Sequence, residues 1–214
     1  MMAEAPTPRR RVLLMASCLA DAAPSISLAV TAAARLQASL EGVLARDPRA
    51  EGAALVMAAG QPLSPERLAR AYAADARAFR RRLDQAAATA ALECAFRIDT
   101  GALPDLALRP PRPDDAVLIA HRRLMALRGP VVLLGGVEGD QPPDQPPVQA
   151  LDLAIDLARA LGLRSRFLPG DTALAEIELL SASLILLPRG MNAPATRLRQ
   201  IIEAARCPVL LNAP

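Results

Sequence analysis

Short runs of apolar residues alternate with amphipathic segments along almost the whole chain, and this alternation limits the fold more than any other feature. The runs at 12–16, 116–120 and 184–187 contain no polar residue. Such runs are typical of strands buried on both faces of a parallel sheet. Further strands are predicted at 93–98, 131–134, 166–168 and 209–211. The pattern predicts an α/β fold with a doubly wound parallel sheet and helices on both faces.

The segments between these runs have the spacing of helices. Apolar residues recur at helical spacing from Ile26 to Leu40, so a helix is predicted there that ends at Gly42. A second apolar stretch follows around 52–58. Ser64 is a predicted N-cap with a first-turn proline behind it, which begins a long helix to about residue 91. Other helices are predicted at 150–161, ended by Gly162, and at 173–180 and 196–205.

Composition excludes several classes of protein. The chain has 214 residues and is 52% hydrophobic, but no apolar run approaches the roughly 18 to 20 residues of a membrane span. We therefore expect no membrane association and a cytoplasmic location, with residues 1–10 as a loose arm. The formal net charge is +3 and only 2% of residues are aromatic, which leaves little on which nucleic-acid bases could stack. A nucleic-acid partner is not expected.

The reactive residue types form no familiar catalytic or metal-binding pattern. The three cysteines, Cys18, Cys94 and Cys207, are far apart and contain no CxxC pair, so they are predicted to be small core residues. His121 is the only histidine, which excludes a metal site with two histidines. No serine lies in a GxSxG motif and the carboxylates are scattered. These observations favour a protein that is not an enzyme.

Two parts of the chain contain the same order of short apolar runs. The stretch 181–190, SASLILLPRG, and the later stretch 206–211, RCPVLL, are similar to the closing strands of the universal stress protein family. Residues 115–120, DAVLIA, and 129–134, GPVVLL, repeat the same order earlier in the chain. The resemblance implies an adenine-nucleotide α-hydrolase-like sheet of two related half-units, a first unit at 11–134 and a shortened second unit at 135–214.

The resemblance also implies where a nucleotide would bind. Members that bind nucleotides place an aspartate at the end of the first strand, where this chain has Ser17, with Asp21 nearby, and Gly136 in the second unit. Their glycine-rich phosphate loop is reduced here to Gly190. Arginines at strand ends could replace some of the lost amide donors, although the interpretation as solvated loop residues is favoured. The candidate cofactor-binding residues are therefore Ser17, Asp21, His121, Arg122, Gly135, Gly136, Arg189 and Gly190.

Three functions follow from this resemblance. The first is a regulatory or interaction protein that is not catalytic, has a degraded nucleotide site and no cofactor, forms a homodimer through edge strands, and has a protein partner that the sequence does not identify. The alternative is a universal stress protein that binds ATP or AMP, with arginines in place of glycines and slow ATP hydrolysis. The third is an enzyme of the wider adenine-nucleotide α-hydrolase-like group, which the single histidine and the missing lysines disfavour.

Overall fold

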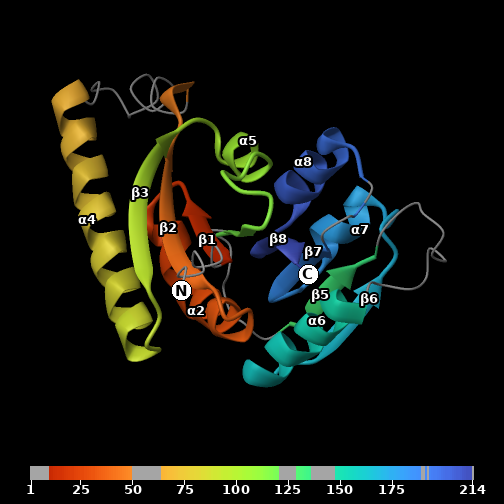
Figure 1. The fold of residues 1–214 in the computed structure, drawn as a ribbon. Coiled ribbons are helices and arrows are strands. Elements are labelled where there is room, and N and C mark those ends of the chain that lie inside the picture. Colours follow the sequence, from red (N-terminus) through yellow and green to blue (C-terminus); the bar gives the residue numbers. More distant parts are fainter. Residues whose placement is uncertain are drawn as a thin grey trace, which may run out of the picture.

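The computed structural model describes residues 10–49, 64–120, 129–135, 148–188, 191 and 193–213, and these form one eight-stranded sheet. The strands are β1 (Arg11–Ala16), β2 (Ser39–Arg46), β3 (Cys94–Thr100), β4 (Ala116–Ile119), β5 (Val131–Leu134), β6 (Ser165–Leu168), β7 (Leu184–Pro188) and β8 (Val209–Ala213). Their order across the sheet is β3-β2-β1-β4-β8-β7-β5-β6 (Figure 1). The predicted α/β sheet is confirmed.

Every strand pair is parallel except β4–β8, which is antiparallel. One arrangement occurs on each side of this pair: β1 lies between β2 and β4, and β5 lies between β6 and β7. Because β4 and β8 run in opposite directions, the parallel strands on the two sides also run in opposite directions. The carboxyl ends of β1 and β5 therefore lie at opposite ends of the sheet, measured along the strands.

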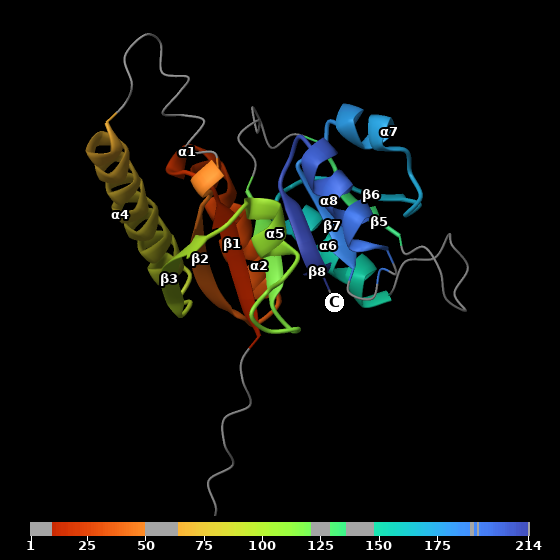
Figure 2. The same ribbon diagram turned by 90° about the horizontal axis from the view of Figure 1, so that it is seen from above.

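Helices cover both faces of the sheet. They are α1 (Leu19–Ala22), the short 3-10 helix η1 (Ala23–Ser25), α2 (Ile26–Arg35), α4 (Pro65–Thr89), α5 (Leu103–Ala107), α6 (Val148–Ala160), α7 (Leu174–Leu179) and α8 (Ala195–Ala204). Buried residues of α2, α4 and α6 share one core cluster, and those of α5, α7 and α8 share the other. Figure 2 shows α4 near one end of the molecule and α7 near the other.

The two core clusters explain why the central strands have no polar residues. In β1, Val12 and Leu14 belong to the α2 side, whereas Leu13 and Met15 belong to the α5 side, and all four are buried. Successive side chains of a strand point to opposite faces, so a strand between two layers needs apolar residues at every position. Within the described residues, no helix has both the length and the hydropathy needed to cross a bilayer.

The beginning of α4 is as predicted. Its N-cap is Ser64, whose side chain accepts a hydrogen bond from the backbone N–H of Arg67 at 3.3 Å, and Pro65 occupies the first turn. The hydrogen bond with Ser64 also lowers the pKa of the exposed Glu66 carboxyl. A carboxylate in the first turn is stabilised by the unpaired N–H groups there. Local sequence therefore determines where this helix starts.

The prediction for residues 26–42 was partly wrong. The helix ends at Arg35, and Leu40 and Gly42 lie in β2. A Cβ on Gly42 would lie 2.6 Å from Leu83 Cδ2 of α4 and 3.0 Å from Phe96 Cδ2 of β3, so the glycine gives α4 room to pack on the sheet. The apolar stretch predicted at 52–58 lies outside the described residues, and α5 was not predicted.

Three helices of one face end in the same way. After α2, Gln37 has a φ of 50° and the N–H of Ala38 bonds to the carbonyl of Ala33 at 2.9 Å. Ala91 after α4 and Gly162 after α6 have φ values of 54° and 66°, and the next N–H bonds back in the same pattern. This is the Schellman motif, which places one residue in the left-handed region. The helix end at Gln37 was missed because the motif is usually marked by glycine.

Glycine in place of a left-handed alanine or glutamine should stabilise the fold. We expect Ala91→Gly and Gln37→Gly each to raise the free energy of unfolding by about 0.5 to 1 kcal/mol, because glycine adopts positive φ without steric strain. Urea unfolding followed by circular dichroism measures the change. Ala90→Gly is the matched control: its φ of −96° suits any residue, so this variant should lose stability. Equal changes in stability for Ala90→Gly and Ala91→Gly would contradict the left-handed conformation assigned to Ala91.

Candidate functional site

The carboxyl end of β1 is where the chain reverses its direction of travel across the sheet. The chain leaves β1 for β2 and β3 on one side, and later returns to β4 on the other side. The N–H of Ala120, just after β4, bonds to the carbonyl of Met15 at 2.8 Å, so the two strand ends are adjacent. Ligands of open α/β sheets bind in the crevice at such points. This strand end is therefore the candidate site.

Two predicted site residues, Ser17 and Asp21, meet at this strand end. The hydroxyl of Ser17 donates a hydrogen bond to Asp21 Oδ2 at 2.8 Å, because the single turn of α1 brings residues four apart onto one side. Asp21 is 9% exposed, and its Oδ1 is buried with no hydrogen-bond partner among the described residues. The side chain of Ser25, at the beginning of α2, is also buried without such a partner.

A third side chain at this end, Asp75, was not predicted. Its Oδ2 accepts a hydrogen bond from the backbone N–H of Leu19 at 3.0 Å. The N-cap residue of α1 is Cys18, whose side chain makes no capping hydrogen bond. The N–H of Leu19 is instead capped by the carboxylate of Asp75, which lies in α4, 56 residues later in the chain. Burial, with a further contribution from Asp21, raises the pKa of the Cys18 thiol. The thiol is therefore less nucleophilic at neutral pH than a free cysteine.

The described groups at this end are better suited to accept hydrogen bonds than to bind phosphate. Neither Asp21 nor Asp75 forms an ion pair within the part of the chain that the structure describes. Carboxylates repel the anionic phosphates of a nucleotide. The cation of Arg46 lies at the end of β2, where its guanidinium is 5.6 Å from the centre of the Tyr72 ring.

Gly135, at the carboxyl end of β5, has a structural explanation. A Cβ here would lie 2.5 Å from Cζ of Phe167, so only glycine leaves room for this ring. The N–H of Gly135 bonds to the carbonyl of Leu168 at 2.8 Å and extends the β5–β6 ladder. That amide is therefore already used and does not serve as a phosphate donor.

The other five predicted site residues lie outside the described residues: His121, Arg122, Gly136, Arg189 and Gly190. Their role in binding a nucleotide stays a prediction. Within the described ranges, no group of three or more His, Cys, Asp or Glu side chains is placed to hold a metal ion.

Several hollows have described walls, and two of them lie at opposite ends of the second half of the sheet. One, of about 100 Å³, lies beside the last residues of β7 and has apolar walls that include Ala107, Leu187 and Leu198. It is smaller than the roughly 300 to 1,000 Å³ of sites for drug-sized ligands. The other, of about 670 Å³, lies at the amino ends of β5 and β6 and is lined in part by Arg164 and Arg166. A third hollow, of about 300 Å³, lies between α2 and α6, where Arg35 is accompanied by Asp152 and Asp156. Of these three, the hollow at the amino ends of β5 and β6 combines the volume and the positive charge for an organic anion.

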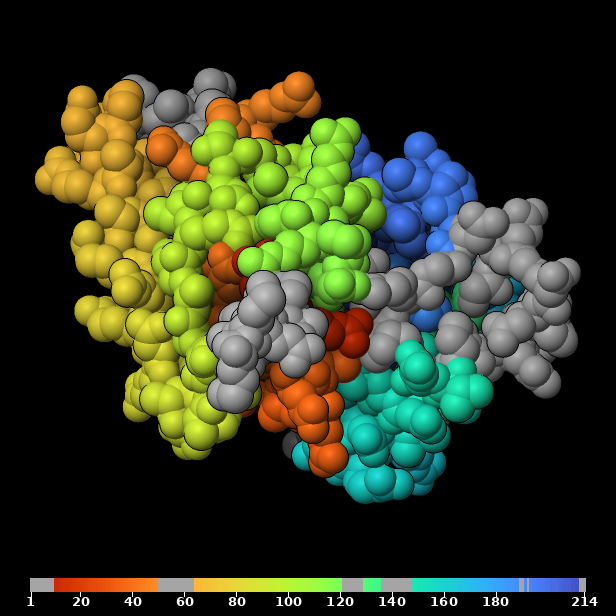
Figure 3. Space-filling view, in the orientation of Figure 1, coloured from red at the N-terminus to blue at the C-terminus, as the bar shows by residue number. Residues whose placement is uncertain are grey.

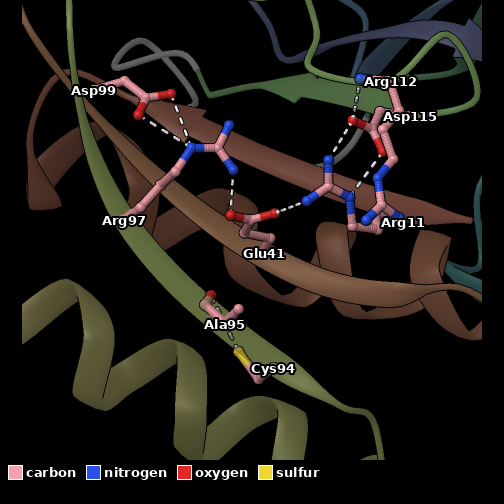
Figure 4. Close-up of polar contacts among 8 residues, drawn as sticks. All are labelled: Arg11, Glu41, Cys94, Ala95, Arg97, Asp99, Arg112 and Asp115. Atoms are coloured by element: carbon pink, nitrogen blue, oxygen red, sulfur yellow. Dashed lines mark hydrogen bonds and ion pairs between the residues drawn. The ribbon is translucent and has the colours of Figure 1, made fainter. Parts of the chain in front are cut away.

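A row of five charged side chains crosses β1, β2 and β3 on the α5 face, and we call it the charge ladder (Figure 4). It consists, in order, of Asp115, Arg11, Glu41, Arg97 and Asp99. Arg11 holds Asp115 with two hydrogen bonds of 2.9 and 2.7 Å and Glu41 with a third of 2.6 Å. Arg97 contacts the other oxygen of Glu41 and holds Asp99 at 2.9 Å. The signs alternate along the row.

The contacts of the charge ladder indicate a structural role. Asp115 and Glu41 are buried, at 1% and 8% exposure, and each accepts hydrogen bonds from arginine. The bidentate contact with Asp115 raises the pKa of Arg11; burial opposes a rise for Arg97, but Asp99 and Glu41 outweigh it. The segment 101–115, green in Figure 3, lies across this face, where α5 has only five residues. The ladder joins strands that no long helix covers here.

Comparison with known proteins gives a likeness of fold. No family model and no curated protein matches the chain. Among solved structures, a universal stress family protein from Burkholderia pseudomallei is 18% identical, with 95% of this chain and 96% of that one covered and a TM-score of 0.32. A universal stress protein from Archaeoglobus fulgidus DSM 4304 is 10% identical, with coverage of 94% and 95% and a TM-score of 0.45.

A further match is a universal stress protein in complex with cAMP, at 15% identity and a TM-score of 0.34, with 77% of this chain and 100% of that one covered. The family that the strand sequences resemble is thus found again among solved structures. Identities and TM-scores this low concern the fold and say nothing of ligand or activity.

Removing the buried end of the charge ladder should destabilise the fold. We expect Asp115→Ala to lower the free energy of unfolding by about 3 kcal/mol, because the Arg11 guanidinium loses its bidentate partner while partly buried. The matched control is Asp156→Ala, which removes an exposed pair with Arg159 at 3.2 Å and should change stability by less than about 0.5 kcal/mol. Urea unfolding measures both; equal small effects would show that the ladder contributes little.

Proposed function

We propose that this chain is a universal stress-like interaction protein that does not catalyse a reaction and does not bind ATP at its strand ends. One observation carries the proposal: the described groups at the carboxyl end of β1 are carboxylates, Asp21 and Asp75, beside a serine that is already hydrogen-bonded. A phosphate there would meet negative charge where a nucleotide site provides amide donors.

The carboxyl ends of β5 and β7 support the same proposal. The amide of Gly135 is used in the sheet, and the hollow beside β7 has about 100 Å³ and apolar walls. A triphosphate needs more volume and several donors. Since the carboxyl ends of β1 and β5 lie at opposite ends of the sheet, measured along the strands, they do not combine into one larger site.

The second candidate function is binding of ATP or AMP. One observation favours it: Ser17 brings the Asp21 carboxylate to the end of β1, and the resemblance expects an aspartate there. A carboxylate at that place can accept hydrogen bonds from ribose hydroxyls. In this case the phosphates would need cations from elsewhere. Of the two predicted arginines, Arg122 follows β4, which ends beside β1, whereas Arg189 follows β7, whose carboxyl end lies at the opposite end of the sheet.

Titration calorimetry of the full chain with ATP, AMP and cAMP, with and without magnesium, tests the proposal. We expect no saturable heat up to millimolar ligand, and no nucleotide in mass analysis of the purified protein. The double variant Asp21→Asn/Asp75→Asn, which removes the repulsion but keeps a carbonyl acceptor at each position, should give a measurable heat with ATP where the wild type gives none. Asp156→Asn, with an exposed carboxylate elsewhere, is the control and should behave as the wild type does.

Saturable binding of ATP by the wild type would contradict the proposal. Arginine variants would then show where on the protein the ATP binds. Loss of this binding in Arg122→Ala would place the nucleotide at the end of β1, as the second function requires, whereas loss in Arg189→Ala would place it at the carboxyl end of β7. Loss in Arg164→Ala/Arg166→Ala would instead place it in the 670 Å³ hollow at the amino ends of β5 and β6.

A further inference from the structure

We infer that the outer edge of β6 is a docking surface for an extended acidic segment of a protein partner, in which acidic residues alternate with apolar ones and pair with Arg164 and Arg166. The inference rests on the proposed function and names the partner chemistry of an interaction protein. β6 pairs with β5 on one side and has no neighbouring strand on the other, at the end of the sheet opposite β3 (Figure 1). An extended peptide can add to such an edge as a further strand.

The hydrogen bonds to β5 determine which backbone groups of β6 remain for a partner. The carbonyls of Arg164 and Leu168 both accept hydrogen bonds of 2.8 Å, from the N–H groups of residues 131 and 135. In a parallel pair, alternate residues direct both backbone groups to the same side. Ser165 and Phe167 therefore direct their N–H and C=O groups away from β5. These are the groups with which an added strand would form hydrogen bonds.

The two faces of β6 differ in chemistry. Leu168 belongs to the core cluster of α7 and α8, whereas Leu163 and Phe167 pack against the cluster of α2, α4 and α6. Side chains alternate along a strand, so Arg164 and Arg166 lie on the α7 face, and both are exposed. The edge therefore carries positive charge on one face and a partly buried apolar surface on the other.

The charges of Arg164 and Arg166 are not neutralised within the described part of the chain. Neither forms an ion pair there, whereas Arg97, the arginine of the other edge strand, is held by Glu41 and Asp99. Exposed positive charge on an edge strand disfavours pairing with an apolar or a basic strand. The same charge favours a strand that brings carboxylates, so it selects for an acidic partner.

The spacing of the two arginines determines the sequence pattern of the partner. They are two residues apart, which on an extended strand is about 7 Å along one face. A partner strand has the same repeat, so acidic residues two apart can face both arginines. In an antiparallel pairing, the residue between them lies opposite Ser165 and exchanges both backbone hydrogen bonds with it. The acidic residues then occupy the closer, non-hydrogen-bonded positions, where opposite charges stabilise the pair.

The other face of the same partner strand should be apolar. The partner residue opposite Ser165 has its side chain on the α6 face, beside the partly buried Leu163 and Phe167. At the amino end of β6 the edge opens into the 670 Å³ hollow, whose lining includes both arginines and Gly162. A Cβ on Gly162 would have no atom within 4 Å, so this wall is open. An antiparallel partner strand leaves β6 at this end, where the hollow gives room for its next residues.

Fluorescence anisotropy of a labelled peptide, SVEVEVS, with the full chain at low ionic strength tests the inference. The matched control peptide is SVVEEVS, which has the same composition and charge but places its two carboxylates on opposite faces of a strand. We expect the alternating peptide to bind about tenfold more tightly or better, and its binding to weaken as salt is added.

A charge exchange on the protein tests the role of the two arginines. Arg164→Glu/Arg166→Glu should weaken the binding of SVEVEVS by about tenfold or more, because like charges then face each other, and should create binding of SVKVKVS. The control is Arg77→Glu/Arg81→Glu, which makes the same change of net charge at exposed residues of α4 and should leave both peptides unaffected. Circular dichroism of both variants checks that the fold is intact.

Several results would overturn the inference: no binding of SVEVEVS at low salt, equal binding of the two acidic peptides, or binding that survives the charge exchange at β6. Equally tight binding of a single-stranded oligonucleotide, lost in the same exchange, would also overturn it, because the edge would then be a general surface for polyanions. The nucleotide titrations are separate. Saturable ATP binding with the peptide results as expected contradicts the proposed function alone, and absence of both ATP and peptide binding overturns this inference alone.

Discussion

The antiparallel pairing of β4 with β8 is the contact on which the rest of the molecule depends. Leu118 faces Leu210 across it, and the neighbouring pairs are Val117 with Leu211 and Ile119 with Val209. All of these side chains are buried. The pairing joins two groups of parallel strands into one sheet, and both core clusters take residues from strands on each side of it. Without it, two unprotected apolar strands would form edges.

This one contact also determines what the strand ends can do. Because it reverses the strand direction, the carboxyl ends of β1 and β5 lie at opposite ends of the sheet, measured along the strands, and cannot share a ligand. It also leaves β3 and β6 as the edge strands. The function proposed here follows from the first of these consequences together with the chemistry at the end of β1, where carboxylates lie.

Much of the fold could be predicted from the sequence, since the buried strands have no polar residue and the start of α4 has a complete set of local signals. β2 could not, because its sequence SLEGVLAR is meaningful only in context. Glu41 is buried because two arginines from other strands bind it, and Gly42 is required because Leu83 packs above it. Neither neighbour is local, so helical periodicity was the stronger signal.

The candidate site shows the same division. Ser17 and Asp21 could be identified, since four residues make one helical turn and a resemblance pointed to this strand end. Asp75 could not, because a carboxylate on a long, mostly exposed helix carries no signal for the N–H group that it caps. The charge ladder was also missed. The alternation of Arg97 with Asp99 in an edge strand was its one local sign, and the partners come from three other segments.

Native-state hydrogen exchange of the β4 and β8 amides tests the central claim most directly. If the β4–β8 pair joins the sheet into one cooperative unit, the protected amides of Leu118 and Leu210 should exchange only through global unfolding, with the free energy measured by urea, and so should those of β1 and β7. Exchange of β5, β7 and β8 through an opening that leaves β1, β2 and β4 protected would contradict it, because the two groups of parallel strands would then be independently stable.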